Sequence, residues 1–276
     1  MAQSPDKYCV IGNPIAHSKS PEIHPVYARQ TGQDLVYERC LAPLDGFAAS
    51  VKQLVADGYR GANVTLPFKL EAARVCTRLE ERAKAAGAVN TLVFENGEII
   101  GDNTDGPGLV ADITRNACVD IHGKRVLLLG AGGAARGALL PLIQQGPREI
   151  VIANRTVATA EALARDFGQP GGHYGVPVTA TGFEAIAGSF DIVINASASS
   201  LAGEVPPVPP SVFGTRTLAL DMMYGSQPTV FMEFASSHGA TARDGLGMLV
   251  EQAAEAFAIW RGVRPDTAEV FAKLRP

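Results

Sequence analysis

The sequence has little excess charge of either sign. Lysine and arginine number 24, against 28 aspartate and glutamate residues, which gives a formal net charge of −4. A protein that binds nucleic acid through bulk electrostatics presents a strongly basic surface, so this balance argues against nucleic acid as a partner. The chain has 276 residues, which is enough for one large domain or two medium ones.

Long uninterrupted apolar runs are also missing. Residues 1–8 are polar and carry no apolar segment of the kind that a secretory signal needs. The most apolar stretch close to membrane-spanning length, residues 126–143, contains Arg136 and several glycines, which makes it a poor spanning helix. We therefore expect a cytoplasmic protein without a membrane partner.

Cysteine and histidine are sparse and poorly spaced for chemistry. The cysteines form no C-x-x-C pair, so we interpret Cys9, Cys40, Cys76 and Cys118 as reduced structural thiols rather than zinc or redox ligands. No two histidines have metal-ligand spacing, and no Gly-x-Ser-x-Gly segment is present. The sequence thus predicts neither a metal site nor a serine-hydrolase triad.

What the chain does contain is an alternation of short apolar strands and helical patterns, without a repeat of 20–50 residues. Strands are expected at residues 8–12, 35–41, 61–65, 125–129, 149–153, 190–195 and 218–221, with a hairpin of 89–94 and 99–100 around Asn96-Gly97. Helices are expected at 21–30, 44–57, 69–86, from the glycine loop to about 145, 156–167 and 246–260. This pattern predicts an α/β fold with doubly wound parallel sheets, in two domains that meet near residues 105–108.

A glycine pattern in the middle of the chain predicts a dinucleotide site. Gly130, Gly132 and Ala135 fit G-x-G-x-x-A directly after an apolar strand and at the start of a helix. Gly130 permits the tight turn, Gly132 lets a pyrophosphate approach the backbone, and Ala135 lets the helix pack closely on the strand. The alternative is a glycine-rich structural turn.

The end of the next strand bears on which dinucleotide is bound. An NAD site typically has an acidic residue there for the ribose 2′-hydroxyl, but this strand is followed by Asn154, Arg155 and Thr156. A guanidinium can pair with a 2′-phosphate, and Thr156 can donate a hydrogen bond or cap the following helix. We therefore favour NADP, the alternative for Arg155 being an ordinary surface arginine.

Two polar loops of the first third can bind a small polar substrate. Ser18 and Ser20 could both grip a carboxylate, although Ser20 could instead cap the helix that begins near Pro21. Asn63 and Thr65 lie on one side of a strand. Both segments lie beside the ends of predicted strands.

Lys69 and a third loop, residues 102–106, are candidates for acid–base work. Lys69 stands at a helix start, where a positive charge opposes the helix dipole, so it is not there for helix stability. A lysine whose ammonium form is disfavoured can act as an acid or base, but a surface lysine is an equal alternative. Asp102 to Gly106 could equally be an Asx-turn with a helix cap.

Taken together, these segments resemble the shikimate dehydrogenase family almost from end to end. The resemblance rests on eight motifs in order: residues 17–21, 63–69, 87–91, 101–106, 130–135, 154–156, 221–224 and 245–252. It implies a two-domain fold, an N-terminal α/β substrate domain plus a Rossmann-type doubly wound parallel sheet. It also implies the reversible NADPH-dependent reduction of 3-dehydroshikimate to shikimate, a step towards chorismate and the aromatic amino acids.

The resemblance also implies residue roles. It makes Lys69 and Asp105 the catalytic pair. The implied substrate contacts are Ser18, Ser20, Thr65, Asn90, Tyr224 and Gln252. The implied cofactor contacts are Gly130, Ala131, Gly132, Gly133, Ala134, Asn154, Arg155, Thr156, Met222, Gly245 and, more loosely, Glu81. The substrate domain would comprise residues 1–105 and 246–276, the NADP domain 106–245, with the active site in the cleft between them and a homodimer as the possible assembly.

Two departures from the family pattern and two rival functions stay open. Thr159 stands where the family often has a second basic residue, which could weaken the preference for NADP, and Ser197 replaces the usual threonine of another loop. A quinate/shikimate dehydrogenase, often NAD-linked, is disfavoured by the missing acidic residue and by the Ser18/Ser20 pair. A catalytically silent NADP-binding sensor is disfavoured by Lys69 and Asp105.

Overall fold

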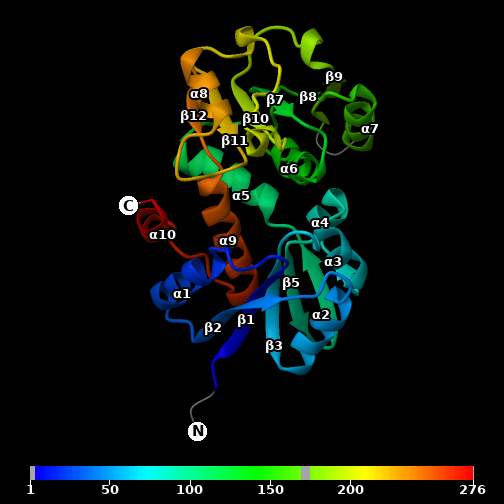
Figure 1. The fold of residues 1–276 in the computed structure, drawn as a ribbon, viewed down its shortest axis with the longest axis vertical. Coiled ribbons are helices and arrows are strands. Elements are labelled where there is room, and N and C mark those ends of the chain that lie inside the picture. The colour runs from blue at the N-terminus through cyan, green and yellow to red at the C-terminus, as the bar shows by residue number, and fades with distance from the viewer. Residues whose placement is uncertain (1–3, 169–174, 276) are drawn as a thin grey trace. The chain divides into compact units, whose positions relative to one another are not determined.

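The computed structural model describes residues 4–168 and 175–275, which form two compact units (Figure 1). The first unit comprises the described residues of 1–108 and 250–276, and the second comprises those of 109–249. Each unit is built on its own six-stranded sheet. The polypeptide chain therefore passes from the first unit into the second and returns to the first at its C-terminal end.

The sheet of the first unit is only partly parallel. Its order is β2-β1-β3-β5-β6-β4, and the strands are β1 (Asp6–Gly12), β2 (Leu35–Leu41), β3 (Tyr59–Val64), β4 (Arg78–Leu79), β5 (Thr91–Glu95) and β6 (Glu98–Asp102). β1 pairs in parallel with β2 and β3, whereas β5 runs antiparallel to both β3 and β6. The predicted hairpin is confirmed: Asn96 (φ 52°) and Gly97 (φ 79°) both adopt the left-handed conformation that a tight two-residue turn requires.

Successive side chains of β1 face opposite sides of this sheet, and each side has its own core. Cys9 and Ile11 pack with the apolar residues of α2 (Phe47–Ala56), α3 (Lys69–Val75) and α4 (Glu81–Ala86). Tyr8 and Val10 pack instead with Tyr37 and Trp260. Helices α1 (Ser20–Thr31), α9 (Leu246–Arg261) and α10 (Ala268–Leu274) complete the unit (Figure 1).

The predicted continuous helix over residues 69–86 is wrong. α3 ends at Val75, and the chain then forms the two-residue strand β4 before α4 begins at Glu81. β4 pairs with β6, where Arg78 lies opposite Ile100 and Leu79 opposite Gly101. This long-range pairing satisfies backbone groups that a helix would otherwise satisfy locally, so tertiary context overrides the helical pattern.

The second unit has a fully parallel sheet of order β12-β11-β10-β7-β8-β9. Its strands are β7 (Arg125–Leu129), β8 (Glu149–Ala153), β9 (Val178–Thr181), β10 (Ile192–Asn195), β11 (Leu218–Asp221) and β12 (Thr241–Arg243). Counted from β7, this is the order 3-2-1-4-5-6 of the Rossmann fold. The predicted doubly wound sheet is confirmed here, although β9 and β12 were not expected from the sequence.

Alternation along β7 again separates two cores. Val126 and Leu128 pack with α6 (Gly133–Ile143) and α7 (Val157–Phe167), while Leu127 and Leu129 pack with α8 (Val230–Ser237) and the segment around Val212. α5 (Asp105–Ala111), followed by a π-helical stretch over Asp112–Asn116, leads into this unit. No helix among the described residues is long and apolar enough to span a membrane.

The four cysteines are free thiols, but only one of them is buried. Cys9 is buried in β1, Cys40 and Cys76 are half-buried, and Cys118 is exposed. The prediction of free thiols holds, whereas an exposed thiol such as Cys118 does not fit the structural role predicted for all four.

Candidate functional site

Lys69 and Asp105 form an ion pair in the first unit. Lys69 is the first residue of α3 and Asp105 the first residue of α5, and Lys69 Nζ lies 2.6 Å from Asp105 Oδ2. Their side chains keep 31% and 24% of their surface exposed, so both remain accessible to a small molecule. The structure thus brings together the two residues that the family resemblance pairs.

Asn90 holds the other oxygen of that carboxylate. Its Nδ2 donates to Asp105 Oδ1 at 2.8 Å, while its own Oδ1 accepts from the backbone N–H of Thr104 at 2.8 Å. Asn90 is only 3% exposed, so water competes little for these bonds. Asp105 is therefore held on both oxygens, by an amide and by the Lys69 ammonium.

Gln252 reaches the same cluster from α9. Its Oε1 lies 3.4 Å from Asn90 Nδ2 and 3.3 Å from Thr104 Oγ1. α9 comes this close because position 108 is glycine: a Cβ on Gly108 would lie 2.6 Å from the Gln252 Cβ. The polar cluster therefore depends on a glycine that carries no chemistry itself.

Ser18, Ser20 and Thr65 lie at the same edge of the sheet, near the carboxyl ends of β1 and β3. The Ser20 amide lies 3.4 Å from Ser18 Oγ, and the Thr65 amide donates to the carbonyl of Ile11 at 3.0 Å. The alternative role of Ser20 as a helix cap is wrong, because α1 begins at Ser20 itself and Lys19 occupies the N-cap position.

Sequence reasoning missed a buried pair behind this cluster. His24 is completely buried, stacks on Tyr37 with ring centroids 4.2 Å apart, and has its Nε2 3.1 Å from Asn63 Oδ1. Burial lowers the pKa of His24 to about 3, so the imidazole is neutral and donates from Nε2. Asn63 Oδ1 also accepts from the Tyr37 hydroxyl at 2.6 Å. No local pattern marks these contacts, because they join β2, β3 and α1.

In the second unit, the glycine turn lies at the point where the strand order reverses. Gly130 follows β7 and adopts φ 102°, which only glycine adopts readily, and a Cβ there would lie 3.2 Å from the amide nitrogen of Ser197. Apart from the adjacent residues and the backbone of α6 itself, a Cβ on Gly132 or Gly133 would have no atom within 4 Å, so the start of α6 faces open space. Exposed N–H groups at a helix start beside a switch point fit a pyrophosphate.

The end of β8 presents polar groups to solvent. Arg155 and Thr156 are exposed, and Asn154 Nδ2 donates to the carbonyl of Thr156 at 2.9 Å. Among residues 4–168 and 175–275, the Arg155 guanidinium makes no ion pair or hydrogen bond. Thr156 occupies the N-cap position of α7, as its alternative role requires, but its side chain makes no capping hydrogen bond. Both side chains are thus available to a 2′-phosphate.

The loop after β11 is held by a buried carboxylate. Asp221 accepts hydrogen bonds from Asn195 Nδ2 at 3.2 Å, from Thr229 Oγ1 at 2.7 Å and from the backbone of Met223 at 3.0 Å. Met222, which follows it, is buried, whereas Tyr224 is 45% exposed. Gly245 lies against this loop, since a Cβ there would lie only 2.2 Å from the Met222 carbonyl oxygen.

The remaining candidate residues lie in different units. Ala131 and Ala134 belong to the glycine turn and the start of α6, whereas Glu81 is an exposed residue at the start of α4 in the first unit. No metal-binding group of three or more His, Cys, Asp or Glu side chains occurs in the described part of the chain.

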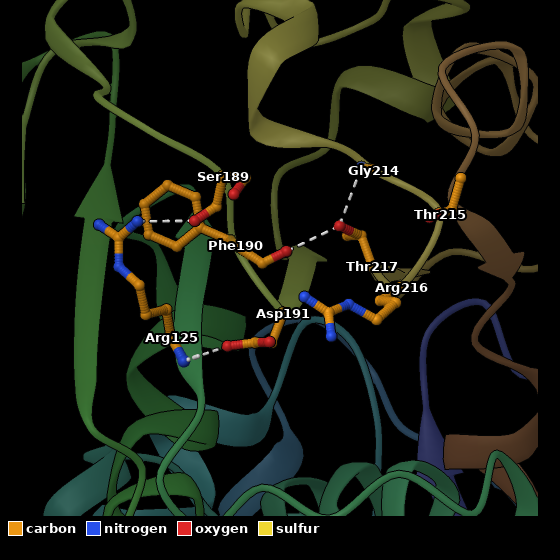
Figure 2. A pocket seen from close by; sticks show the side chains of 8 residues that line it. All are labelled: Arg125, Ser189, Phe190, Asp191, Gly214, Thr215, Arg216 and Thr217. Atoms are coloured by element: carbon orange, nitrogen blue, oxygen red, sulfur yellow. Dashed lines mark hydrogen bonds between the residues drawn. The ribbon is translucent and has the colours of Figure 1, made fainter.

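A pocket in the second unit lies at the opposite ends of the strands from the glycine turn. It has a volume of about 400 Å³ and is lined by Arg125, Ser189, Phe190, Asp191, Gly214, Thr215, Arg216 and Thr217 (Figure 2). Arg125, Asp191 and Thr217 stand at or before the amino ends of β7, β10 and β11, whereas the glycine turn follows the carboxyl end of β7. Ligands of open α/β sheets bind at the carboxyl ends, so this pocket is not the dinucleotide site.

Comparison with protein families gives three matches along the chain. Residues 10–92 match the model "Shikimate dehydrogenase substrate binding domain", residues 112–202 match "Shikimate / quinate 5-dehydrogenase", and residues 245–274 match "Shikimate 5'-dehydrogenase C-terminal domain".

Full-length relatives agree with these matches. The chain is 62% identical to the shikimate dehydrogenase (NADP(+)) of Janthinobacterium sp. (strain Marseille), over 100% of this chain and 99% of that protein. Among solved structures, the Ael1 enzyme from Pseudomonas putida is 47% identical, with a TM-score of 0.93 and 98% of both chains covered. The Thermus thermophilus shikimate 5-dehydrogenase, in complex with NADP(H) and shikimate, is 30% identical, with a TM-score of 0.84 over 98% of this chain and 100% of that one.

By class, the fold and the relatives define an NADP-dependent oxidoreductase that acts on a CH–OH group. Within that class, the chain belongs to the shikimate dehydrogenase family.

Proposed function

We propose that this protein catalyses the reversible NADPH-dependent reduction of 3-dehydroshikimate to shikimate, in the route to chorismate and the aromatic amino acids. The observation that carries the proposal is the Lys69–Asp105 ion pair, fixed by Asn90, in a chain of this family. A silent NADP-binding sensor would have no use for such a pair.

The chemistry assigns each of these residues a step. NADPH, when bound, supplies the hydride that reduces the carbonyl carbon. Lys69 donates a proton from Nζ to the carbonyl oxygen as the negative charge develops, and it takes the proton back in the reverse direction. Asp105 holds the ammonium group in place through Oδ2 and can accept a hydrogen bond from a neighbouring substrate hydroxyl.

Substrate binding is proposed for six polar residues. Two hydroxyls, Ser18 and Ser20, would hold the ring carboxylate. Further hydrogen bonds to the substrate would come from Thr65, Asn90, Tyr224 and Gln252. Side-chain amides and hydroxyls suit a ligand that carries hydroxyl groups and one carboxylate.

Cofactor binding is proposed for the second unit. The backbone of residues 130–134 would hold the pyrophosphate, Asn154, Arg155 and Thr156 the 2′-phosphate, and Met222 and Gly245 would line the rest of the site, with Glu81 as an outlying candidate. The exposed guanidinium of Arg155 supports NADP over NAD. The shikimate 5-dehydrogenase of Listeria monocytogenes is 28% identical, with a TM-score of 0.88 over 98% of this chain and 96% of that one, and was solved with shikimate and NAD. This similarity supports a weaker, secondary use of NAD by the present protein.

The proposal extends to domain roles, location and assembly. Residues 1–105 and 246–276 would form the substrate domain and residues 106–245 the NADP domain, in a cytoplasmic enzyme. A homodimer is the proposed assembly, which sedimentation velocity of the purified protein would test.

The decisive assay follows NADPH formation from NADP⁺ with shikimate or with quinate. We expect turnover with shikimate, and a kcat lowered by roughly 10²-fold or more in Lys69→Ala, the scale of one general acid–base group. Lys84→Ala, which removes an exposed lysine from α4, is the matched control. No shikimate turnover by the wild type would refute the proposal, faster turnover of quinate would favour the rival substrate, and an active Lys69→Ala would show that another group moves the proton.

A further inference from the structure

Arg39 places a positive charge beside the serines that are proposed to hold the substrate carboxylate. It belongs to β2, two residues before the strand ends at Leu41. Its Nη2 donates to the backbone carbonyl of Ser18 at 2.8 Å. A cation on this strand is thus bonded directly to the loop that carries Ser18 and Ser20.

The alternation of side chains along β2 brings Arg39 to this loop. Tyr37 and Arg39 lie two residues apart, so they project from the same face of the sheet. On that face, Tyr37 stacks on His24 of α1 with ring centroids 4.2 Å apart. The serine loop leads directly into α1, so the next side chain of this face, that of Arg39, meets the loop.

The guanidinium lies close enough to attract a carboxylate that Ser18 holds. Covalent geometry keeps the carbonyl and side-chain oxygens of one serine within about 5 Å of each other, and a hydroxyl–carboxylate hydrogen bond adds about 2.7 Å. With the 2.8 Å contact to the Ser18 carbonyl, Arg39 Nη2 and the carboxylate oxygen would be at most about 10 Å apart. The Debye length at about 0.1 M salt is also about 10 Å, so the two charges attract each other.

The charge of Arg39 is not neutralised by a neighbouring carboxylate. Within residues 4–168 and 175–275, Arg39 takes part in no ion pair, and its bond to Ser18 is to a neutral carbonyl. Lys19, the cation between the two serines, is instead paired with Glu22 at 3.0 Å, which offsets much of its charge. Because Ser18 and Ser20 are themselves neutral, the charge of Arg39 favours an anionic substituent at this loop.

We propose that Arg39 is a specificity residue for the negative charge of the substrate, whose guanidinium attracts the ring carboxylate to Ser18 and Ser20. The inference rests on the proposed function, because it requires a carboxylate at these serines. The reaction does not change the carboxylate, so the attraction is equal in the bound substrate and in the transition state. Arg39 therefore lowers the KM for shikimate and leaves kcat unaltered.

The test compares Arg39→Gln, which removes the charge, with Arg39→Lys, which keeps it. At saturating NADP⁺ and an ionic strength of about 0.01 M, Arg39→Gln should raise the KM for shikimate about threefold to fivefold without a change in kcat. At about 1 M, where the Debye length is about 3 Å, Arg39→Gln and the wild type should have the same KM. Arg39→Lys should stay within about twofold of the wild type at every ionic strength.

The methyl ester of shikimate is the second probe, because it keeps the ring and its hydroxyls but carries no negative charge. The wild type and Arg39→Gln should turn it over, or be inhibited by it, with equal constants. Arg148→Gln is the matched control, since it removes an exposed arginine next to β8 in the second unit and changes the net charge equally. It should leave the KM for shikimate unchanged.

An unchanged KM for shikimate in Arg39→Gln at low salt would overturn the inference. So would a rise that persists at about 1 M salt or is equal for the ester, because Arg39 would then act through its bond to Ser18 and not through its charge. An equal rise in Arg148→Gln would overturn it as well. A wild-type protein without shikimate turnover would instead overturn the proposed function, so the two failures are distinguishable.

Discussion

The two units prepare their candidate sites in opposite ways. In the first unit, Lys69, Asp105, Asn90 and Gln252 are already tied to one another by side-chain hydrogen bonds. In the second unit, the start of α6 faces open space and Arg155 extends into solvent. One site is a network of fixed side chains, and the other is exposed backbone with a solvent-facing cation beside it.

The difference follows from what each site would hold. A pyrophosphate is recognised by charge and by N–H groups whose direction the helix already sets, so no side-chain network is needed. A hydroxylated ring must instead be held in one orientation for hydride transfer, because a small misplacement of the reacting atom costs rate. Side chains that are held in place before the substrate binds would therefore benefit the site in the first unit most.

The strongest test of this contrast removes the proposed carboxylate anchor from the first unit. In Ser18→Ala/Ser20→Ala, each lost bond to a charged group is worth roughly 1.5–3 kcal/mol, so the KM for shikimate should rise by about 10²-fold or more. Part of the loss should appear in kcat, because a loosely held ring reacts less often. Steady-state kinetics would measure both.

Ser50→Ala, which removes a hydroxyl from α2 of the same unit, is the control for the double variant. Neither serine occupies the N-cap position of α1, and Ser18 Oγ accepts only a long bond from the Ser20 N–H, at 3.4 Å, so melting temperatures of the two proteins should be similar. A folded double variant with wild-type KM and kcat would mean that the carboxylate is bound elsewhere.

A smaller effect is expected when the second unit loses its solvent-facing cation. Arg155→Ala should weaken NADPH binding by about 1.5–3 kcal/mol, the worth of a hydrogen bond to a charged group, and leave NADH binding nearly unchanged. Titration of each cofactor, followed by nicotinamide fluorescence, would measure both affinities. Arg165→Ala, an exposed arginine of α7, is the control, and equal losses for NADPH and NADH would show that Arg155 does not read the 2′-phosphate.

A third effect, on stability and not on binding, concerns the response of the first unit to acid. The pKa of His24 is lowered to about 3, against about 6.5 in an unfolded chain, so the unfolded state binds the additional proton between these values. The contribution of neutral His24 to stability is therefore full above about pH 6.5 and is lost as the pH falls towards 3. This dependence should amount to at most about 1.4 kcal/mol per pH unit.

His24→Gln retains a hydrogen-bond donor but cannot titrate, so its free energy of unfolding should fall less steeply from pH 6.5 downward. Urea unfolding can be followed by the fluorescence of Trp260, the single tryptophan, whose ring lies 5.3 Å from that of His24. Parallel curves for the two proteins would contradict a buried neutral histidine.

How far the sequence predicts this molecule depends on the range of the interactions. The strand Arg125–Leu129 agrees with the prediction at both ends, because its apolar run is buried on both faces and so sets its pattern locally. β4 was missed because two residues paired with β6 leave no periodic signal. The glycine turn could be found from its spacing, whereas the His24–Asn63 pair and the contact between Asn90 and Gln252 could not, since they arise between distant segments.

The order in which the units can fold during synthesis follows from the interrupted first unit. Residues 109–249 form a continuous unit, so they can fold as soon as they leave the ribosome. The first unit has to wait for the end of the chain: Trp260 Nε1 bonds to the Leu92 carbonyl across 168 residues, and Tyr27 bonds to the Val250 carbonyl across 223. The first unit therefore stays incomplete until translation is nearly finished, and until then Tyr8, His24 and Tyr37 lack the Trp260 ring on which they pack.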